Sequence, residues 1–391
     1  MSLEVRSLGC RLNLSEGEAL RGLLAGASDL VVINSCAVTS EAVRQTRQAI
    51  RRARRERPEA RLLVTGCAAE VERESLAAMP EVDGFVANAA KLDPRAWQVP
   101  AGKAEVATSL HTRAFVAVQN GCDHDCTFCI IPQGRGPSRS HVPAEIIAEV
   151  ARHCDAGVRE VVLTGVDLTS WGADLTGKPR LGALVASILR ACPGLTRLRL
   201  SSLDGVEIDA ELLELLAGEP RVMPHLHLSL QSGSDLILKR MKRRHLRRDA
   251  VELVVGLQAR RPDIAIGADL IAGFPTEDEA AHAENLSIIR ELGIVHGHIF
   301  PYSRRPGTPA ARMPQVGGAT IKRRAAELRA AVADQRRQWL ESLLGQNLAV
   351  LAERDGTGHA PNFARVQLRP GTLAGELVTI TPTRIAEGLL A

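Results

Sequence analysis

Short apolar runs alternate with helical patterns along most of the 391-residue chain, and this alternation restricts the fold more than any other feature. Near the N-terminus, strand-like runs and helical patterns follow one another at 3–8, 16–26, 29–34, 40–56, 61–65 and 69–78. Strands that alternate with helices form parallel sheets, because a parallel pair needs a long crossover connection. The sequence therefore predicts an N-terminal doubly wound parallel α/β domain.

The alternation resumes after residue 114 and repeats six times. The strand candidates are Phe115–Gln119, Glu160–Thr164, Arg197–Ser201, Leu226–Leu230, Ile264–Leu270 and Val295–Phe300. Helical stretches are predicted near 143–155, 181–191, 207–217, 234–258 and 277–292. Six such repeats predict a partial (β/α)6 barrel, with a flatter Rossmann-like sheet as the alternative. In either fold the chemistry belongs at the carboxyl ends of the strands.

The last part of the chain changes character. A charged helix is predicted over 320–344, and the segment after it holds short strand-like runs and glycine-rich turns, typical of a small all-β barrel. The segment 92–112 contains proline and glycine and has no sustained period, which indicates a boundary between domains. We therefore expect three domains, with bounds 1–105, 108–338 and 342–391.

Charge and composition limit the possible partners. No run of eighteen apolar residues occurs, so we expect no membrane span, and the N-terminus lacks a basic-then-apolar leader, so we expect a cytoplasmic protein. The net charge of +4 includes basic clusters at 51–55, 239–248 and 322–324. Such clusters can neutralise RNA phosphates, although solvated helix faces give the same pattern. Aromatic residues are only 3% of the chain, which argues against base stacking along an aromatic strip.

One group of cysteines indicates metal chemistry. Cys122, Cys126 and Cys129 follow the pattern C-x3-C-x2-C directly after the first barrel strand, where three thiolates can hold three corners of a [4Fe–4S] cube. A structural zinc site is closed by four protein ligands, so the missing fourth ligand favours a cluster with one open iron. Zinc with His124 as its fourth ligand is the alternative.

The N-terminal cysteines each follow a predicted strand. Cys10, Cys36 and Cys67 are far apart in the sequence, but loops at the carboxyl ends of neighbouring parallel strands meet in one crevice. The three thiols can therefore converge, and three buried structural thiols are the alternative. Cys154 and Cys192 stand alone in amphipathic segments, where we expect ordinary core thiols.

The loop from Cys122 to Cys129 resembles the radical S-adenosylmethionine signature, with Phe128 in its usual aromatic position before the last cysteine. In that family the open iron binds the methionine portion of S-adenosylmethionine, and one electron from the reduced cluster breaks the sulfonium bond. The cluster thus places the electron beside the sulfonium and aligns the C–S bond. The resemblance implies S-adenosylmethionine as cofactor and a flavodoxin- or ferredoxin-like electron donor.

The N-terminal cysteine segments resemble the three cysteine motifs of the methylthiotransferases. These segments are Gly9-Cys10-Arg11-Leu12-Asn13, Asn34-Ser35-Cys36-Ala37-Val38-Thr39 and Thr65-Gly66-Cys67. Those enzymes carry a second [4Fe–4S] cluster, whose sulfur species receives a methyl group from one S-adenosylmethionine molecule while another molecule yields the radical. The resemblance implies two clusters and replacement of the adenine C2–H by C–SCH3, with no general acid or base assigned.

Further motifs that resemble the family indicate contacts to cofactor and substrate. The implied cofactor-binding residues are Phe128, Thr164, Gly165, Asp167, Ser201, Gln231, Asp269 and Gly273. His227 lies on the polar face of the predicted strand 225–231, where it implies a substrate contact or a hydrogen-bonded structural network. The segment 356–366 resembles the RNA-binding TRAM domain.

The segment from Phe300 to Pro309 most resembles the branch of the family that acts on N6-threonylcarbamoyladenosine at position 37 of tRNA. Arg304 and Arg305 suit that substrate, because guanidinium groups bind carboxylates in bidentate fashion, whereas an isopentenyl group needs an apolar pocket. The alternatives within the family are isopentenyladenosine in tRNA and an aspartate of a ribosomal protein. A radical enzyme of another reaction type and an RNA-binding protein with zinc sites are the rivals outside it.

Overall fold

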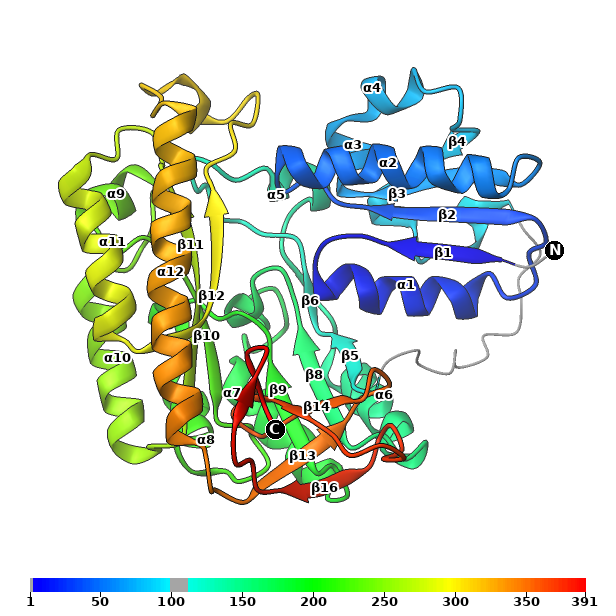
Figure 1. Ribbon diagram of the computed structural model, residues 1–391. Coiled ribbons are helices and arrows are strands. Elements are labelled where there is room, and N and C mark those ends of the chain that lie inside the picture. Colours follow the sequence, from blue (N-terminus) through cyan, green and yellow to red (C-terminus); the bar gives the residue numbers. More distant parts are fainter. Residues whose placement is uncertain (1–2, 99–111) are drawn as a thin grey trace. The chain divides into compact units, whose positions relative to one another are not determined.

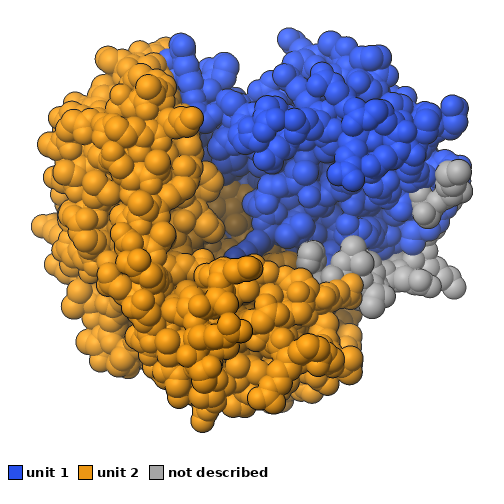
Figure 2. All heavy atoms as spheres, viewed as in Figure 1, with its two compact units in different colours: residues 1–110, 119–139, 303–311 blue, residues 111–118, 140–302, 312–391 orange. Residues whose placement is uncertain are grey.

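The computed structural model describes residues 3–98 and 112–391, which form two compact units (Figure 2). Unit 1 comprises residues 1–110, 119–139 and 303–311, and unit 2 comprises residues 111–118, 140–302 and 312–391. The predicted boundary between residues 105 and 108 lies outside the described residues, so the three domain bounds stay predictions.

Unit 1 contains a parallel sheet in the order β1-β2-β3-β4 (Figure 1). Its strands are β1 (Glu4–Ser7), β2 (Leu30–Ser35), β3 (Arg61–Gly66) and β4 (Gly84–Phe85). Its helices are α1 (Arg11–Leu23), α2 (Ser40–Glu56), α3 (Cys67–Val71), α4 (Arg73–Ala77) and α5 (Ile131–Arg135), with 3-10 turns at Asn88–Ala90 and Pro94–Trp97 and a short strand β6 (Gln119–Asn120). The predicted parallel α/β fold of this region is confirmed.

Both faces of this sheet are covered because β2 is apolar on both sides. Val31 and Ile33 pack with Ile50 of α2, whereas Val32 belongs to a second core cluster with Leu20 of α1. A continuous apolar strand of this kind is typical of a sheet buried between two helical layers.

Two helices of unit 1 differ from the sequence prediction. The helix predicted at 16–26 begins earlier, at Arg11, because the chain turns at Gly9 (φ +90°) and Cys10 takes the extended N-cap position. The helix predicted at 69–78 is two short helices separated at Glu72, whose φ of −116° is not helical.

Unit 2 contains the six predicted barrel strands in two three-stranded parallel sheets, β5-β8-β9 and β10-β11-β12. Parallel bridges from Leu198 to Val222 and from Leu203 to Leu228 join the two sheets. The strands are β5 (Ala114–Ala117), β8 (Glu160–Thr164), β9 (Arg197–Leu200), β10 (His225–Gln231), β11 (Ala265–Ala272) and β12 (Ile294–Pro301). The short strand β7 (Arg139–Ser140) lies where the chain passes from unit 1 to unit 2.

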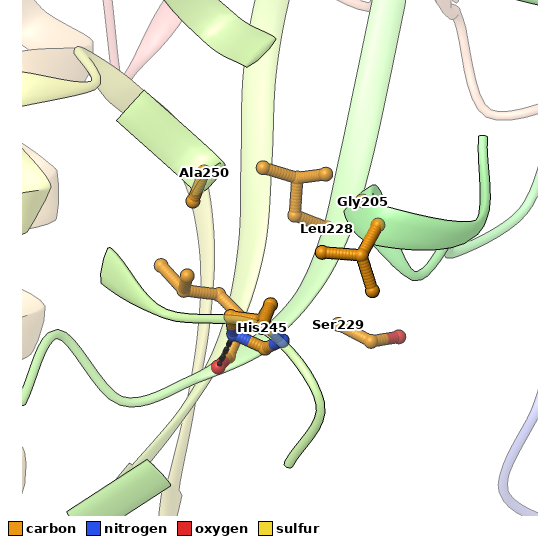
Figure 3. A pocket seen from close by; sticks show the side chains of 7 residues that line it. Gly205, Leu228, Ser229, His245 and Ala250 are labelled. Carbon is orange, nitrogen blue, oxygen red and sulfur yellow. Dashed lines mark hydrogen bonds between the residues drawn. The ribbon is translucent and has the colours of Figure 1, made fainter. Parts of the chain in front are cut away.

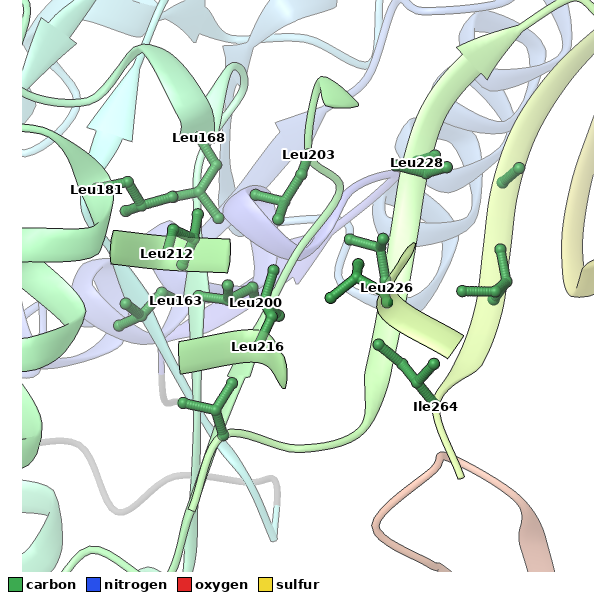
Figure 4. Packing of buried hydrophobic residues seen from close by; sticks show 14 of the residues in the cluster. Leu163, Leu168, Leu181, Leu200, Leu203, Leu212, Leu216, Leu226, Leu228 and Ile264 are labelled. Atoms are coloured by element: carbon green, nitrogen blue, oxygen red, sulfur yellow. The ribbon is translucent and has the colours of Figure 1, made fainter. Parts of the chain in front are cut away.

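Helices and leucine-rich packing surround these strands. The helices are α6 (Pro143–Asp155), α7 (Leu181–Ala191), α8 (Ala210–Gly218), α9 (Asp235–Arg240), α10 (Arg247–Arg260) and α11 (Glu279–Glu291), with 3-10 turns at Leu168–Ser170 and Gly205–Glu207. Leu163 and Leu200 from the strands meet Leu212 and Leu216 from α8 in the core (Figure 4). The helix predicted at 234–258 is interrupted, because Lys242 takes a positive φ of +56°.

The C-terminal part of unit 2 begins, after a 3-10 turn at Pro309–Arg312, with the long helix α12 (Gly318–Ser342), which packs against β12. A small sheet in the order β16-β13-β14-β15-β18-β17 follows. Its strands are β13 (Leu348–Ala352), β14 (Thr357–His359), β15 (Arg365–Gln367), β16 (Leu377–Ile380), β17 (Ile385–Ala386) and β18 (Leu389–Leu390). The predicted small all-β domain is confirmed. No helix of the described chain is long and apolar enough to cross a membrane.

The small sheet domain is joined to the barrel strands by buried polar and aromatic contacts. Arg199 of β9 is fully buried, forms an ion pair with Glu160 of β8, and lies 4.7 Å from the ring of Phe363. The same ring stacks on His359 and lies 5.0 Å from His225 of β10. Phe363 adopts a φ of +70°, a costly conformation that persists only where the surroundings fix it.

Candidate active site

The loop that carries Cys122, Cys126 and Cys129 belongs to unit 1 and follows β6. All three thiols are partly buried, and the sulfurs of Cys122 and Cys129 accept hydrogen bonds at 3.4 Å from the backbone N–H groups of His124 and Ile131. Backbone donors of this kind are found around cluster sulfurs and favour the thiolate form. Three thiols on one short loop, two of them with backbone donors, therefore suit a [4Fe–4S] cube.

The loop is held closed by its flanking backbone. The Cys122 N–H donates to the Gly136 carbonyl at 3.2 Å, and the Ala310 N–H donates to the Thr127 carbonyl at 2.9 Å. Gly121 adopts a φ of +75°, and a Cβ at this position would lie 1.9 Å from the Pro137 carbonyl oxygen. Only glycine fits there, so Gly121 allows the cysteine loop to pack directly against the backbone of Pro137.

The second thiol group lies at the carboxyl ends of the parallel strands of unit 1. Cys36 directly follows β2, Cys67 directly follows β3, and Cys10 precedes α1. A Cβ on Gly9 would lie 2.6 Å from the Cys36 sulfur, and one on Gly134 would lie 3.1 Å from the Cys67 Cβ. Two glycines thus allow backbone to approach the thiols closely, as a cluster cradle requires.

The three thiols influence one another. Burial, together with the neighbouring Cys67 and Cys10 thiols, raises the pKa of the Cys36 thiol to about 11. Burial also raises the pKa of Cys67, whereas the positive charge of Arg135 opposes that change. The strands that precede Cys36 and Cys67 are neighbours in the sheet, and Gly9, next to Cys10, packs against Cys36. This arrangement agrees with the predicted convergence, and the shared cluster stays a prediction.

A buried charge network adjoins this second thiol group. Lys91 forms an ion pair with Glu16 at 2.5 Å, and Arg135 donates to the same carboxylate at 2.9 Å. The side chains of all three residues are at most 4% exposed. Although burial alone would raise it, the pKa of Glu16 is held below its ordinary value by Lys91 and Arg135. Sequence analysis missed Glu16 and Lys91, because nothing in the local pattern separates them from surface charges.

The predicted cofactor-binding residues of unit 2 cluster at strand ends. Thr164 ends β8, Ser201 follows β9 and donates its N–H to the Leu163 carbonyl at 3.0 Å, and Gln231 ends β10 with a φ of +69°. Gly273 follows β11 with a φ of +72°. These positions are the carboxyl ends at which barrel enzymes bind ligands, and the binding roles stay predictions.

The remaining predicted residues lie in the connecting loops. Gly165 and Asp167 follow β8, and the Asp167 carboxylate accepts a hydrogen bond from the Ser170 hydroxyl at 2.6 Å. Phe128 is partly buried within the loop of Cys122 in unit 1. The roles of these three residues likewise stay predictions.

Asp269 is not at a strand end but inside β11. Its Oδ1 contacts His227 Nε2 of β10 and His298 Nδ1 of β12, both at 3.0 Å. Although burial alone would raise it, the pKa of Asp269 is held well below its ordinary value by hydrogen bonds from the two imidazoles. The sequence pattern named His227 and Asp269 but missed His298, which the alternation His296-Gly297-His298 along β12 could have indicated.

The two arginines predicted to bind substrate lie in unequal environments. Arg304 is exposed, whereas Arg305 is buried and donates to the Glu72 carboxylate at 2.8 Å within unit 1. Of these two arginines, Arg304 is therefore the one whose guanidinium is accessible to a substrate carboxylate.

Most arginines of the three basic clusters are engaged in ion pairs within their own unit. The pairs are Arg52–Glu56, Arg54–Asp83, Arg243–Asp204, Arg244–Glu207, Arg247–Glu291, Arg323–Glu279 and Arg324–Glu277. These pairs occupy the arginines within the fold, and a contact of the exposed members of the clusters with RNA phosphates stays a prediction.

A small apolar hollow adjoins β10 (Figure 3). It measures about 10 Å³ and is lined by Leu228, Ser229, Ala250 and His245, whose ring nitrogen lies 3.1 Å from the Leu230 carbonyl. This volume holds about one water molecule, so the hollow is too small for a cofactor.

The chain is similar in sequence to known protein families and to known enzymes. A family model described as the radical SAM superfamily matches residues 116–286, and one described as uncharacterized protein family UPF0004 matches residues 2–87. The threonylcarbamoyladenosine tRNA methylthiotransferase MtaB of Rickettsia prowazekii is 42% identical, over 99% of this chain and 96% of the relative. A tRNA-2-methylthio-N(6)-dimethylallyladenosine synthase of Cereibacter sphaeroides is 33% identical, over 90% and 88%.

Among solved structures, the radical S-adenosylmethionine methyltransferase TsrM of Kitasatospora setae has a TM-score of 0.54 at 16% identity, over 77% of this chain and 68% of that one. Fold, thiol sites and similarities together define a radical S-adenosylmethionine enzyme, a class that binds a [4Fe–4S] cluster and S-adenosylmethionine. This class favours iron–sulfur over zinc at the loop of Cys122. Within it, the chain belongs to the MtaB family of methylthiotransferases, enzymes that transfer methylthio groups.

Proposed function

We propose that the protein adds a methylthio group to C2 of N6-threonylcarbamoyladenosine at position 37 of tRNA. The observation that carries this proposal is the 42% identity to the Rickettsia enzyme of that name across 99% of the chain. Relatives named as dimethylallyladenosine synthases reach only 32% and 33%. The name of the first relative supports a tRNA substrate with an acidic appendage.

The exposed guanidinium of Arg304 supports this choice of substrate. A threonylcarbamoyl group carries a carboxylate, and an exposed arginine such as Arg304 can bind it through two parallel hydrogen bonds. Arg305 is already paired with Glu72, so its contribution is to hold the segment 303–311 in place. An apolar dimethylallyl group would gain nothing from either side chain.

Two [4Fe–4S] clusters are proposed, one on Cys122, Cys126 and Cys129 and one on the thiol group of Cys10, Cys36 and Cys67. When bound, they supply the electron that cleaves S-adenosylmethionine and the sulfur that accepts its methyl group. The chain's own part would be to hold each cluster through three thiolates, and the close backbone approaches at Gly9, Gly121 and Gly134 would enclose the two sites. These roles follow from the donor sets, which contain three thiols each.

The other assignments belong to the same proposal. Thr164, Ser201, Gln231 and Gly273 line the carboxyl ends of the barrel strands, where they would contact S-adenosylmethionine, and the C-terminal domain 342–391 would contact tRNA. A flavodoxin- or ferredoxin-like protein would deliver electrons, and the cytoplasm, where tRNA and such donors are found, would be the location.

The proposal is tested with anaerobically reconstituted protein, S-adenosylmethionine, a reductant and two tRNA substrates. One tRNA carries threonylcarbamoyladenosine and the other carries dimethylallyladenosine, and digested nucleosides are analysed by mass spectrometry. We expect a methylthio adduct of the first nucleoside only, and no adduct with the Cys126→Ala variant. An adduct of the second nucleoside alone would overturn the substrate assignment and leave the reaction class intact.

A further inference from the structure

The most unusual feature beside the second thiol group is a set of buried charges that the proposed chemistry does not use directly. Arg135 ends α5 and has a side chain only 2% exposed. Its Nη1 donates to Glu16 at 2.9 Å and to Asn120 at 2.8 Å, and its Nη2 donates to Glu16 at 3.1 Å and also to Asn13. The guanidinium is therefore fixed in one orientation.

Lys91 adds a second buried cation to this set. Its Nζ contacts the Glu16 carboxylate and lies 3.3 Å from the Asn34 amide oxygen at the end of β2. Two cations thus share one carboxylate, so the buried network carries a net positive charge. An uncompensated buried charge is expensive, so a counter-charge is expected nearby.

The proposed cluster, held by thiolates of the second group, would supply this counter-charge. Gly134, which precedes Arg135, touches Cys67, and the amide of Asn88 donates to the Gly134 carbonyl at 2.6 Å. Asn13, to which Arg135 also donates, donates in turn to backbone carbonyls in the segments just before Cys10 and Cys36. The chain therefore places a fixed cation close to the segments that carry all three proposed ligands of the second cluster.

Arg135 acts here through its charge rather than by binding a ligand. Both of its terminal nitrogens already donate to protein oxygens, so they are not offered to a reactant. A cube held by three thiolates is anionic and gains a further negative charge on reduction, and net charge around a cluster is one of the factors that set its potential. A buried cation stabilises the reduced form more than the oxidised form, because the interior screens it weakly.

We propose that Arg135, held by Glu16 and supported by Lys91, is a positioning residue that raises the reduction potential of the cluster on Cys10, Cys36 and Cys67. This inference rests on the proposed function, since it requires that second cluster. It assigns the network a redox role in addition to its contribution to the fold. If the network had only a structural role, removing a positive charge and removing the negative charge would have the same effect, namely loss of stability.

The test uses the full chain with Cys122, Cys126 and Cys129 changed to alanine, so that only the second cluster forms. The reduction potential of this cluster is measured by electron paramagnetic resonance during a stepwise one-electron titration, with iron content determined in parallel. In this background Arg135→Gln and Lys91→Gln each remove a cation, and Glu16→Gln removes the anion. Arg95→Gln is the matched control, because its side chain is 90% exposed and its charge is screened by solvent.

We expect the potential to become more negative in Arg135→Gln and in Lys91→Gln, less negative in Glu16→Gln, and unchanged in Arg95→Gln. Where Arg135→Gln or Lys91→Gln fails to bind iron, the opposite shifts of the remaining cation variant and of Glu16→Gln still decide the question. Where Glu16→Gln fails, more negative potentials in both cation variants beside an unchanged Arg95→Gln support the inference, and unchanged potentials overturn it. Shifts in the same direction for both signs of charge, or no shift, would overturn the inference. A parent protein without a cluster at this site would instead overturn the proposed second cluster, and the inference with it.

Discussion

Arg304 and Arg305 are neighbours in the sequence, but their side chains lie in different environments in the structure. The first is exposed, and the second is buried against Glu72. The sequence alone predicts one carboxylate-binding pair, because a pattern does not show which of two adjacent arginines is buried. The contact with Glu72, 233 positions away, is visible only after folding.

This difference predicts separate phenotypes. Arg304→Ala is expected to lower kcat/KM for threonylcarbamoyladenosine tRNA by roughly 10- to 100-fold, the cost of a lost charged hydrogen bond of about 1.5–3 kcal/mol, with unchanged thermal stability. Arg305→Ala is expected to lower the melting temperature, since it leaves Glu72 without this partner. Steady-state assays and thermal scans check both, and normal kinetics in Arg304→Ala would remove the proposed carboxylate contact.

The buried thiol of Cys36 offers a second test at this scale. Cys36→Ala is expected to reduce iron from about eight to about four atoms per chain, because each proposed cube holds about four irons. Reductive cleavage of S-adenosylmethionine should persist, since it belongs to the other cluster, whereas methylthio product should vanish. Cys192→Ala, a buried thiol in the core of unit 2, is the matched control and should keep both activities and the full iron content.

At the scale of elements, the turn after β11 combines a strained backbone with close packing on α12. Gly273 has a φ of +72°, and a Cβ there would lie 2.6 Å from the Ile321 side chain. The Gly273 N–H also donates to the Glu277 carboxylate at 3.1 Å, which in turn contacts Arg324. The turn is therefore fixed both by its own conformation and by the long helix.

Gly273→Ala should consequently destabilise this element. The left-handed conformation costs about 1 kcal/mol for a residue with a Cβ, and displacement of Ile321 adds to that cost. We expect a lower melting temperature and weaker S-adenosylmethionine binding, measured by thermal scanning and equilibrium dialysis. Gly194→Ala, which has open space around its Cβ position and no positive φ, should change neither; equal behaviour of the two variants would contradict the proposed role of the turn.

Periodicity predicted elements well where burial is regular and poorly where the backbone turns locally. All six barrel strands and the three long strands of unit 1 were placed from apolar runs. The break between α9 and α10 was not predicted, because the positive φ of Lys242 does not change the spacing of hydrophobic residues. The same limit applies to the site. Motif spacing singled out the six cysteines proposed to hold the clusters, whereas the Glu16, Lys91 and Arg135 network depends on tertiary contacts between distant segments.

At the scale of the whole molecule, the junction of barrel and small sheet domain in unit 2 contains several buried or partly buried imidazoles. His296 of β12 lies 5.3 Å from His225, 5.7 Å from Phe363 and 5.2 Å from Trp339 of α12, measured between ring centroids. Burial lowers the pKa of His296 from its ordinary 6.5 to about 3, and the nearby Arg336 adds to the effect. The folded protein therefore keeps this ring uncharged, while the unfolded chain protonates it below pH 6.5.

The sign of this shift predicts acid sensitivity. As pH falls from 6.5 towards 3, the unfolded state binds a proton that the folded state does not, so stability decreases, by about 2 kcal/mol at pH 5 from this group. His296→Gln should show a smaller fall in melting temperature between about pH 7.5 and about pH 5 than the unchanged protein. An identical fall in both proteins would show that other groups dominate the acid response.

The division of unit 1 among three stretches of chain also has a consequence for biosynthesis. Residues 303–311 complete this unit, through the Ala310 hydrogen bond to the Thr127 carbonyl and the contact of Arg305 with Glu72. A ribosome must therefore translate the intervening barrel before the loop of Cys122 acquires its final surroundings. An assembly machinery that delivers iron and sulfide would therefore find the completed site of Cys122, Cys126 and Cys129 only when the nascent polypeptide is nearly full length.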